Sequence, residues 1–265
     1  WSYGGKRAVD LLAGGVPCPP FSVAGKGLGH DDERDLFPEV IRLAREIQPR
    51  AIMIENVKGL LSTRFSNYRE ALLGQLADLG YVGEWRLLHA ADFGVAQLRP
   101  RSVLVAFSGG ANDFFEWPTP RPSKITVGEA IGELMAENGW LGASEWLARA
   151  DEIAPTLVGG SKKHGGPDLG PTRAKAQWLA RFGVDAKGIA NEAPSVDFIG
   201  NPRLTVEMAA AIQGFPRDWK FTGKKTARYR QVGNAFPPPV AEAVGLAIRN
   251  ALLLSEAKSI REELP

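Results

Sequence analysis

Residues 36–55, LFPEVIRLAREIQPRAIMIE, decide the fold class of this chain. Apolar residues at positions 36, 40, 43, 44 and 47 have the spacing of one helix face, and Pro49 ends that pattern. Four apolar residues and an acid follow at 51–55, which predicts a buried strand. A helix that leads into a fully apolar strand is typical of a parallel sheet covered on both faces.

The same alternation continues outward from this stretch. We expect strands at 7–12, 85–89 and 102–107, a helix at 68–79 closed by Gly80, and a last helix at 238–254 that begins with proline. From about 108 to 222, Gly and Pro become frequent and the alternation is weak. We therefore predict an α/β domain formed by 1–108 and 223–265, with a loop-rich domain at 109–222 inserted into it.

Composition excludes several classes of protein. The apolar runs are too short to cross a membrane, and no leader for export opens the chain. The single cysteine excludes an internal disulfide and fits a cytoplasmic protein. We expect no metal site, because His30 beside Asp31 and Asp32 has the composition of a solvated loop.

The net charge of +2 is unevenly distributed. Residues 161–230 hold thirteen Lys or Arg against six Asp or Glu, so the rest of the chain is net acidic. A basic stretch beside an acidic body is typical of a face that binds a polyanion, although a solvated surface shows the same pattern.

Cys18 is the first candidate catalytic residue. It lies in the stretch GGVPCPPFS at 14–22, just after a predicted strand, and carboxyl ends of strands are where α/β sheets bind ligands. Pro17 and Pro19 restrict the backbone on both sides. A lone cysteine is most often an inert buried residue, but this position favours a nucleophile.

Polar side chains follow the next strands. Glu55 closes a strand, where burial favours its protonated form, able to donate to a ring nitrogen; a capping or ion-paired Glu is the alternative. Gln97, Arg99 and Arg101 alternate in an extended segment and would line one surface, as a solvated strand edge would also show.

These residues belong to an ordered series of motifs. The series is Pro-Cys at 17–18, Glu-Asn-Val at 55–57, Gln-x-Arg-x-Arg at 97–101, Arg-Leu-Thr at 203–205 with Gln-Gly-Phe-Pro at 213–216, and Gln-Val-Gly-Asn-Ala at 231–235. It resembles motifs IV, VI, VIII, IX and X of the cytosine-5 DNA methyltransferase family, and Arg-Asp-Leu-Phe at 34–37 resembles motif V. The resemblance covers the chain except for its variable middle.

The resemblance implies a role for each catalytic residue. Cys18 would attack C6 of a cytosine flipped out of duplex DNA, and Glu55 would protonate or hydrogen-bond N3. Arg101 would contact the base O2 and Arg99 would hold Glu55. The methyl group would come from S-adenosylmethionine.

The resemblance also implies binding residues. Pro17, Leu36, Asn234 and Ala235 match family positions that touch S-adenosylmethionine. Residues 21–37 match a mobile loop that closes over DNA, and 109–222 correspond to the target-recognition domain. The expected DNA contacts are Ser22, Gln97, Lys162, Lys163, Arg173 and Lys175.

The chain departs from the family in two ways. Pro19 stands where the family commonly has Gln, and motifs I to III, which hold most of the cofactor pocket, are absent. The implied fold is a Rossmann-like methyltransferase sheet without its N-terminal strands, so that 7–12 becomes an exposed apolar edge. We therefore expect an upstream segment or companion chain to complete the functional protein.

Two alternatives to a DNA-methylating enzyme stay open. A transfer-RNA cytosine-5 methyltransferase would share the chemistry, and a truncated homologue would bind DNA without catalysis. The basic, Gly-rich insert favours DNA, and four retained catalytic residues argue against a binding module. A restriction–modification role in a bacterial cytoplasm is implied only by the family.

Overall fold

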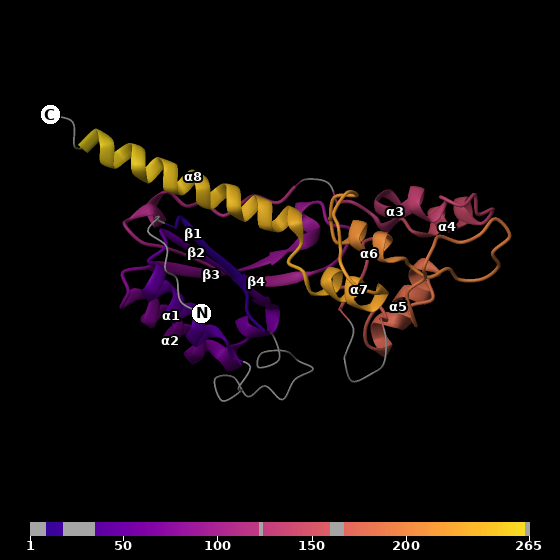
Figure 1. The fold of residues 1–265 in the computed structure, drawn as a ribbon, viewed down its shortest axis with the longest axis horizontal. Helices are drawn as coiled ribbons and strands as arrows, with labels where there is room; N and C mark the ends of the chain where they lie inside the picture. Colours follow the sequence, from indigo (N-terminus) through magenta and orange to yellow (C-terminus); the bar gives the residue numbers. More distant parts are fainter. Residues whose placement is uncertain (1–8, 18–34, 122–123, 160–166, 263–265) are drawn as a thin grey trace. The chain divides into compact units, whose positions relative to one another are not determined.

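The computed structural model describes residues 9–17, 35–121, 124–159 and 167–262. The chain divides into two compact units (Figure 1). The first unit comprises Trp1–Leu88, Pro100–Thr119 and Glu242–Pro265, and the second comprises His89–Arg99 and Pro120–Ala241. The second unit thus includes 89–99 and 223–241, outside the inserted domain expected at 109–222.

A four-stranded sheet forms the centre of the first unit. Its strands are β1 (Leu11–Gly15), β2 (Ala51–Val57), β3 (Val82–His89) and β4 (Pro100–Phe107), in the order β1-β2-β4-β3. β1 pairs with β2 in parallel, whereas β2 pairs with β4 antiparallel. The α/β class is confirmed, but the expectation of a wholly parallel sheet is wrong.

The connection between β3 and β4 explains the antiparallel strand. Residues 90–99 hold a 3₁₀ turn at Ala90–Phe93 and no α-helix. A parallel neighbour needs a crossover of a dozen or more residues, usually helical. The chain therefore turns back after β3, and β4 enters the sheet in the opposite direction to β2.

Helices cover both faces of this sheet. The apolar residues of α1 (Phe37–Ile47) and α2 (Ser66–Ala77) join one core with Ile52, Ile54, Leu104 and Ala106 of the strands. The long helix α8 (Pro238–Glu262) runs along the opposite face (Figure 1). Arg50, just before β2, donates to the Leu252 carbonyl at 3.3 Å and pairs with Glu256 at 2.6 Å.

The second unit is built from short helices around its own core. Thr126 and Thr205 cap two of these helices by accepting hydrogen bonds from Glu129 N and Met208 N, which fixes where the helices begin. Trp178 and Phe182 are fully buried at the centre. The helices are α3 (Val127–Met135), α4 (Ala143–Arg149), α5 (Thr172–Phe182), α6 (Val206–Ile212) and α7 (Lys225–Asn234).

Short 3₁₀ turns connect several of these elements. Besides Ala90–Phe93, they are Lys58–Leu61, Thr63–Phe65 and Ala111–Phe114.

Within the described residues, no helix has both the length and the apolar content that crossing a bilayer requires. The same residues contain no cluster of three or more His, Cys, Asp or Glu side chains arranged for a metal ion.

Candidate active site

The carboxyl ends of β1 and β2 bring Glu55 against the backbone of Gly15. The two residues are direct partners in the parallel register. A side chain at position 15 would place its Cβ 3.0 Å from Oε2 of Glu55, closer than ordinary van der Waals contact. The absence of a side chain at Gly15 is therefore what allows the carboxyl group to occupy this position.

Arg101 holds the same carboxyl group from the neighbouring strand. Its Nε lies 2.6 Å from Oε1 of Glu55, and the two side chains are only 13% and 11% exposed. The register places Arg101 opposite Val57, so Arg101 and Glu55 emerge on one face of the sheet. The resemblance assigned Arg99 to Glu55 and Arg101 to the base; the structure shows that Arg101 also contacts Glu55.

Asn56 links β2 to the segment that leads toward Cys18. Its side chain is fully buried; it donates to the Val16 carbonyl at 3.4 Å and accepts from Val57 N at 2.8 Å. Val16 is followed by the half-buried Pro17. Cys18 itself lies outside the described residues, so its expected proximity to Glu55 stays a prediction.

Asp35 and Tyr68 fix the start of α1, next to the expected cofactor contact Leu36. Asp35 accepts hydrogen bonds from Phe37 N at 3.0 Å and from the Tyr68 hydroxyl at 2.5 Å. Burial, and then the Asp35 carboxylate, raise the pKa of the Tyr68 hydroxyl far above its usual value. Tyr68 therefore stays protonated and donates its hydrogen bond to Asp35. Leu36, between Asp35 and the first residue of α1, is 42% exposed.

Arg99 binds backbone carbonyls inside the second unit. Its guanidinium donates to the carbonyls of Leu157 at 2.6 Å, Gly233 at 2.8 Å and Ala235 at 2.9 Å, and the residue is 1% exposed. These contacts join the segment after β3 to the loop at 157 and to the end of α7. Arg99 thus orders the segment that contains the expected cofactor contacts Asn234 and Ala235.

Gln97 does not have the exposed position expected of a DNA contact. It is fully buried, and its amide donates to Gln213 Oε1 and to the Ile212 carbonyl. Its Oε1 accepts from Leu157 N at 3.0 Å, so both ends of the amide are used internally. Gln97, Arg99 and Arg101 were expected to line one surface; Gln97 and Arg99 are almost fully buried and both bind partners within the second unit.

Backbone packs closely at the end of α7. A Cβ on Gly233 would lie 2.5 Å from the backbone of Gly159, and a Cβ on Gly159 would lie 2.2 Å from Asn234 Oδ1. Gln213 Nε2 donates to the Ala235 carbonyl at 2.8 Å. The Asn234 side chain is therefore held beside Gly159 while the residue itself remains exposed.

The expected phosphate contacts are only partly described. Arg173 is exposed in the first turn of α5, whereas Lys175 pairs with Asp168 at 2.9 Å. An ion pair reduces the charge that Lys175 presents to a phosphate. Ser22, Lys162 and Lys163 lie outside the described residues.

Three features that position candidate site residues were not singled out from the sequence. Gly15, the Asp35–Tyr68 pair and Gln213 each position a candidate site residue. Asp35 and Gln213 stand inside the motifs at 34–37 and 213–216, and Gly15 lies in the stretch 14–22 around Cys18, which was the available signal. Tyr68 is separated from Asp35 by 33 residues and carried no such signal.

Comparison with known sequences identifies relatives over nearly the whole chain. Residues 5–250 match the family model described as C-5 cytosine-specific DNA methylase. The type II methyltransferase M.NaeI of Lentzea aerocolonigenes is 60% identical over 92% of this chain and 60% of its own length. M.NgoMIV of Neisseria gonorrhoeae is 56% identical over 94% of this chain and 80% of its own length. The chain thus spans between three fifths and four fifths of these relatives.

Solved structures share the fold at low sequence identity. The Entamoeba histolytica methyltransferase EhMeth is 15% identical with a TM-score of 0.58, over 92% of this chain and 78% of its own. A Spodoptera frugiperda DNMT2 variant is 19% identical with a TM-score of 0.53, over 92% and 80% respectively. These likenesses show that the chain shares the fold of both structures.

Proposed function

Because the chain belongs to the C-5 cytosine-specific DNA methylase family, we propose that it carries the catalytic and target-recognition parts of an enzyme that methylates C5 of cytosine in duplex DNA. The observation that carries the proposal is the position of Glu55, which lies against Gly15 and is paired with Arg101. Cys18 follows Gly15 by three residues. A thiol and a carboxyl group are thereby tethered to the ends of two adjacent parallel strands.

In this proposal Cys18 is the nucleophile and Glu55 the group at the opposite side of the base. The sulfur forms a bond to C6 of a flipped cytosine, which makes C5 electron-rich. Glu55 protonates or hydrogen-bonds N3 and stabilises the charge that enters the ring. Arg101 orients Glu55. Loss of the C5 proton after methylation then releases Cys18 and restores the aromatic ring.

S-adenosylmethionine, when bound, supplies the methyl group. Its proposed contacts on this chain are Pro17, Leu36, Asn234 and Ala235. All four are at least partly exposed, as residues that touch a ligand must be. The residues that hold most of the cofactor in the family are those of motifs I to III.

We also propose that a further segment pairs with β1. Among the described strands β1 lies at the edge of the sheet, and its last three residues are exposed. An unpaired edge strand invites pairing with another strand. An upstream segment or companion chain that carries motifs I to III would cover this edge and complete the cofactor pocket.

The proposed DNA-binding region is the second unit, which contains most of the target-recognition domain expected at 109–222. Arg173 is the described exposed candidate for a phosphate contact, and the relatives are named type II methyltransferases. We propose the same restriction–modification class for this chain. Methyl transfer to transfer RNA but not to duplex DNA would instead favour the RNA-modifying alternative.

The test is covalent trapping on duplex DNA that contains 5-fluorocytosine, with S-adenosylmethionine and the complete protein. We expect an adduct stable to denaturing electrophoresis, because fluorine at C5 cannot leave as the proton does. Cys18→Ser is expected to give no adduct and to retain DNA binding within about threefold. No adduct with the unaltered protein, or near-normal turnover by Cys18→Ser, would contradict the proposal.

A further inference from the structure

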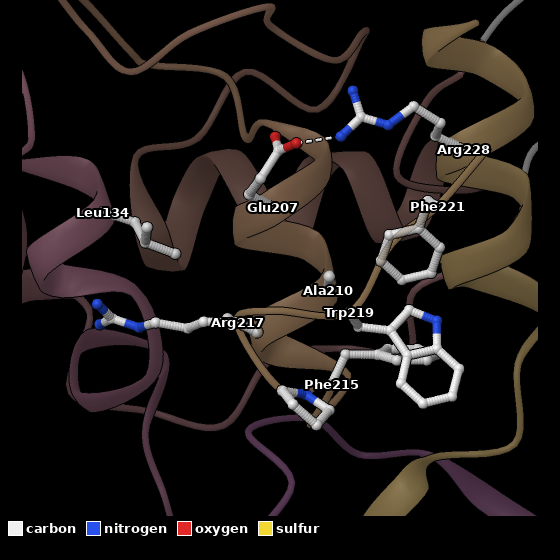
Figure 2. A pocket seen from close by; sticks show the side chains of 10 residues that line it. Leu134, Glu207, Ala210, Phe215, Arg217, Trp219, Phe221 and Arg228 are labelled. Atoms are coloured by element: carbon white, nitrogen blue, oxygen red, sulfur yellow. Dashed lines mark hydrogen bonds and ion pairs between the residues drawn. The ribbon is translucent and has the colours of Figure 1, made fainter. Parts of the chain in front are cut away.

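The second unit contains an apolar pocket apart from the residues discussed so far. The pocket has a volume of about 260 Å³ and lies between α6, α7 and the segment that joins them, with Leu134 of α3 opposite (Figure 2). Pockets for drug-sized ligands span roughly 300–1,000 Å³. This pocket therefore suits a single ring system rather than a large cofactor.

Aromatic rings form one side of the pocket. Phe215 lies 5.4 Å from Trp219 and 5.0 Å from Phe221, measured between ring centroids. Figure 2 shows these three rings gathered on one side, with Ala210 on the floor. Trp219 is 55% exposed. An exposed indole beside an apolar floor offers a surface on which a planar ring can stack.

Charged groups surround the opening. Arg228 pairs with Glu207, both of which line the pocket, and Arg217 pairs with Glu133 nearby. Lys220 and Lys224 on the same segment are exposed. Residues 217–230 hold six Lys or Arg against one Asp. Cations beside an aromatic surface suit a phosphate beside a base, and the Glu207 carboxylate suits an exocyclic amino group.

We infer that this pocket binds an unpaired nucleotide of DNA, with the base stacked on Trp219 and the flanking phosphate near Lys220. The inference rests on the proposed function only in taking DNA as the partner. A fully paired duplex does not offer a free base face, so the site distinguishes unpaired from paired DNA. The surplus of cations on 217–230 favours a nucleic acid over an apolar protein segment as the occupant.

The test compares binding of three fluorescein-labelled DNA probes by anisotropy at low salt. The probes are a mixed-sequence single strand, a duplex with one bulged nucleotide, and the same duplex fully paired. Trp219→Ala is expected to weaken binding of the first two about tenfold, as loss of one stacked base does. Trp219→Phe retains a stacking ring and is expected to bind within about threefold of the unaltered protein.

Ile199→Ala is the matched control, because Ile199 is a 95% exposed apolar residue of the same unit outside the pocket. Thermal unfolding of every variant separates loss of folding from loss of binding. The inference is overturned if Trp219→Ala binds all three probes normally, if it weakens the paired duplex equally, or if the unaltered protein binds no single strand. These outcomes are independent of covalent trapping, so they do not depend on whether methylation itself is demonstrated.

Discussion

Glu55 shows how closely neighbouring residues define one side chain. The β1–β2 register places Gly15 beside it, and the antiparallel β4 brings Arg101 to the same carboxyl group at 2.6 Å. Sequence reasoning identified Glu55 from its place after four apolar residues. It did not predict the ion pair with Arg101, because Arg99 and Arg101 alternate in the same way along an extended chain.

Gly15→Ala tests whether the position of the Glu55 carboxyl group matters for catalysis. The new methyl group would push against Oε2 of Glu55 from 3.0 Å, so the carboxyl group must shift. We expect the rate of adduct formation with 5-fluorocytosine DNA to fall roughly threefold to tenfold, because a shift of the carboxyl group by a few tenths of an ångström is smaller than the displacement of about 1 Å that costs about a hundredfold. The melting temperature should change little.

Gly14→Ala provides the control for this variant. A Cβ at position 14 meets no described atom within 4 Å. Its adduct rate should stay within about twofold of the unaltered protein, since backbone stiffening is then the only change. Equal rates for both variants would show that Gly15 has no special role.

At the level of elements, α1 is held by a side chain from α2. Asp35 accepts from the start of α1 and from Tyr68 of α2. The periodicity of residues 36–47 predicted α1 well, because the apolar stripe is a local property. The contact between Asp35 and Tyr68 was not predictable, since Tyr68 belongs to α2, which begins 29 residues after the start of α1.

Tyr68→Phe is expected to remove a pH-dependent part of stability. Burial and Asp35 raise the folded-state pKa of Tyr68, whereas the unfolded value is about 10. Stability from this group is therefore complete below pH 10 and declines above it, because only the unfolded chain loses the proton. The decline approaches about 1.4 kcal/mol per pH unit for one proton.

Urea denaturation between pH 8 and 11 measures this difference. The unaltered protein should lose stability above pH 10 more steeply than Tyr68→Phe does. At pH 8 the variant should be less stable by about 1 kcal/mol, the usual contribution of one hydrogen bond. Parallel pH profiles would rule out a protonated Tyr68 as the group that fixes α1.

Across the whole chain, Arg99 joins segments that are far apart in sequence. Its three carbonyl partners lie 58, 134 and 136 residues away. Arg99→Ala would leave these carbonyls without their donor in a buried place. We expect a loss of about 3 kcal/mol or more in the free energy of unfolding, from denaturation curves.

Arg217→Ala is the comparison for Arg99→Ala. Arg217 is in the same unit, but its side chain is 67% exposed and pairs with an exposed Glu133. Exposed ion pairs contribute little, so its unfolding curve should nearly overlay that of the unaltered protein. If both variants lost similar stability, the buried role of Arg99 would not hold.

The amino-acid sequence by itself determined the α/β class, the approximate positions of the strands and helices of the first unit, and family membership. These depend on hydrophobic periodicity and on ordered motifs, both of which are written along the chain. It also predicted 238–254 as a helix, which the structure extends to Glu262. It did not place the helices α3 to α6, because the stretch 109–222 was expected to be loop-rich.

Only the tertiary structure decided the direction of β4, the ion pair of Glu55 and the internal use of Gln97. Each of these depends on which distant segments become neighbours. A polar residue in an extended segment has the same local pattern whether it faces water or a buried carbonyl. Burial and partner choice follow from three-dimensional packing, which no local pattern specifies.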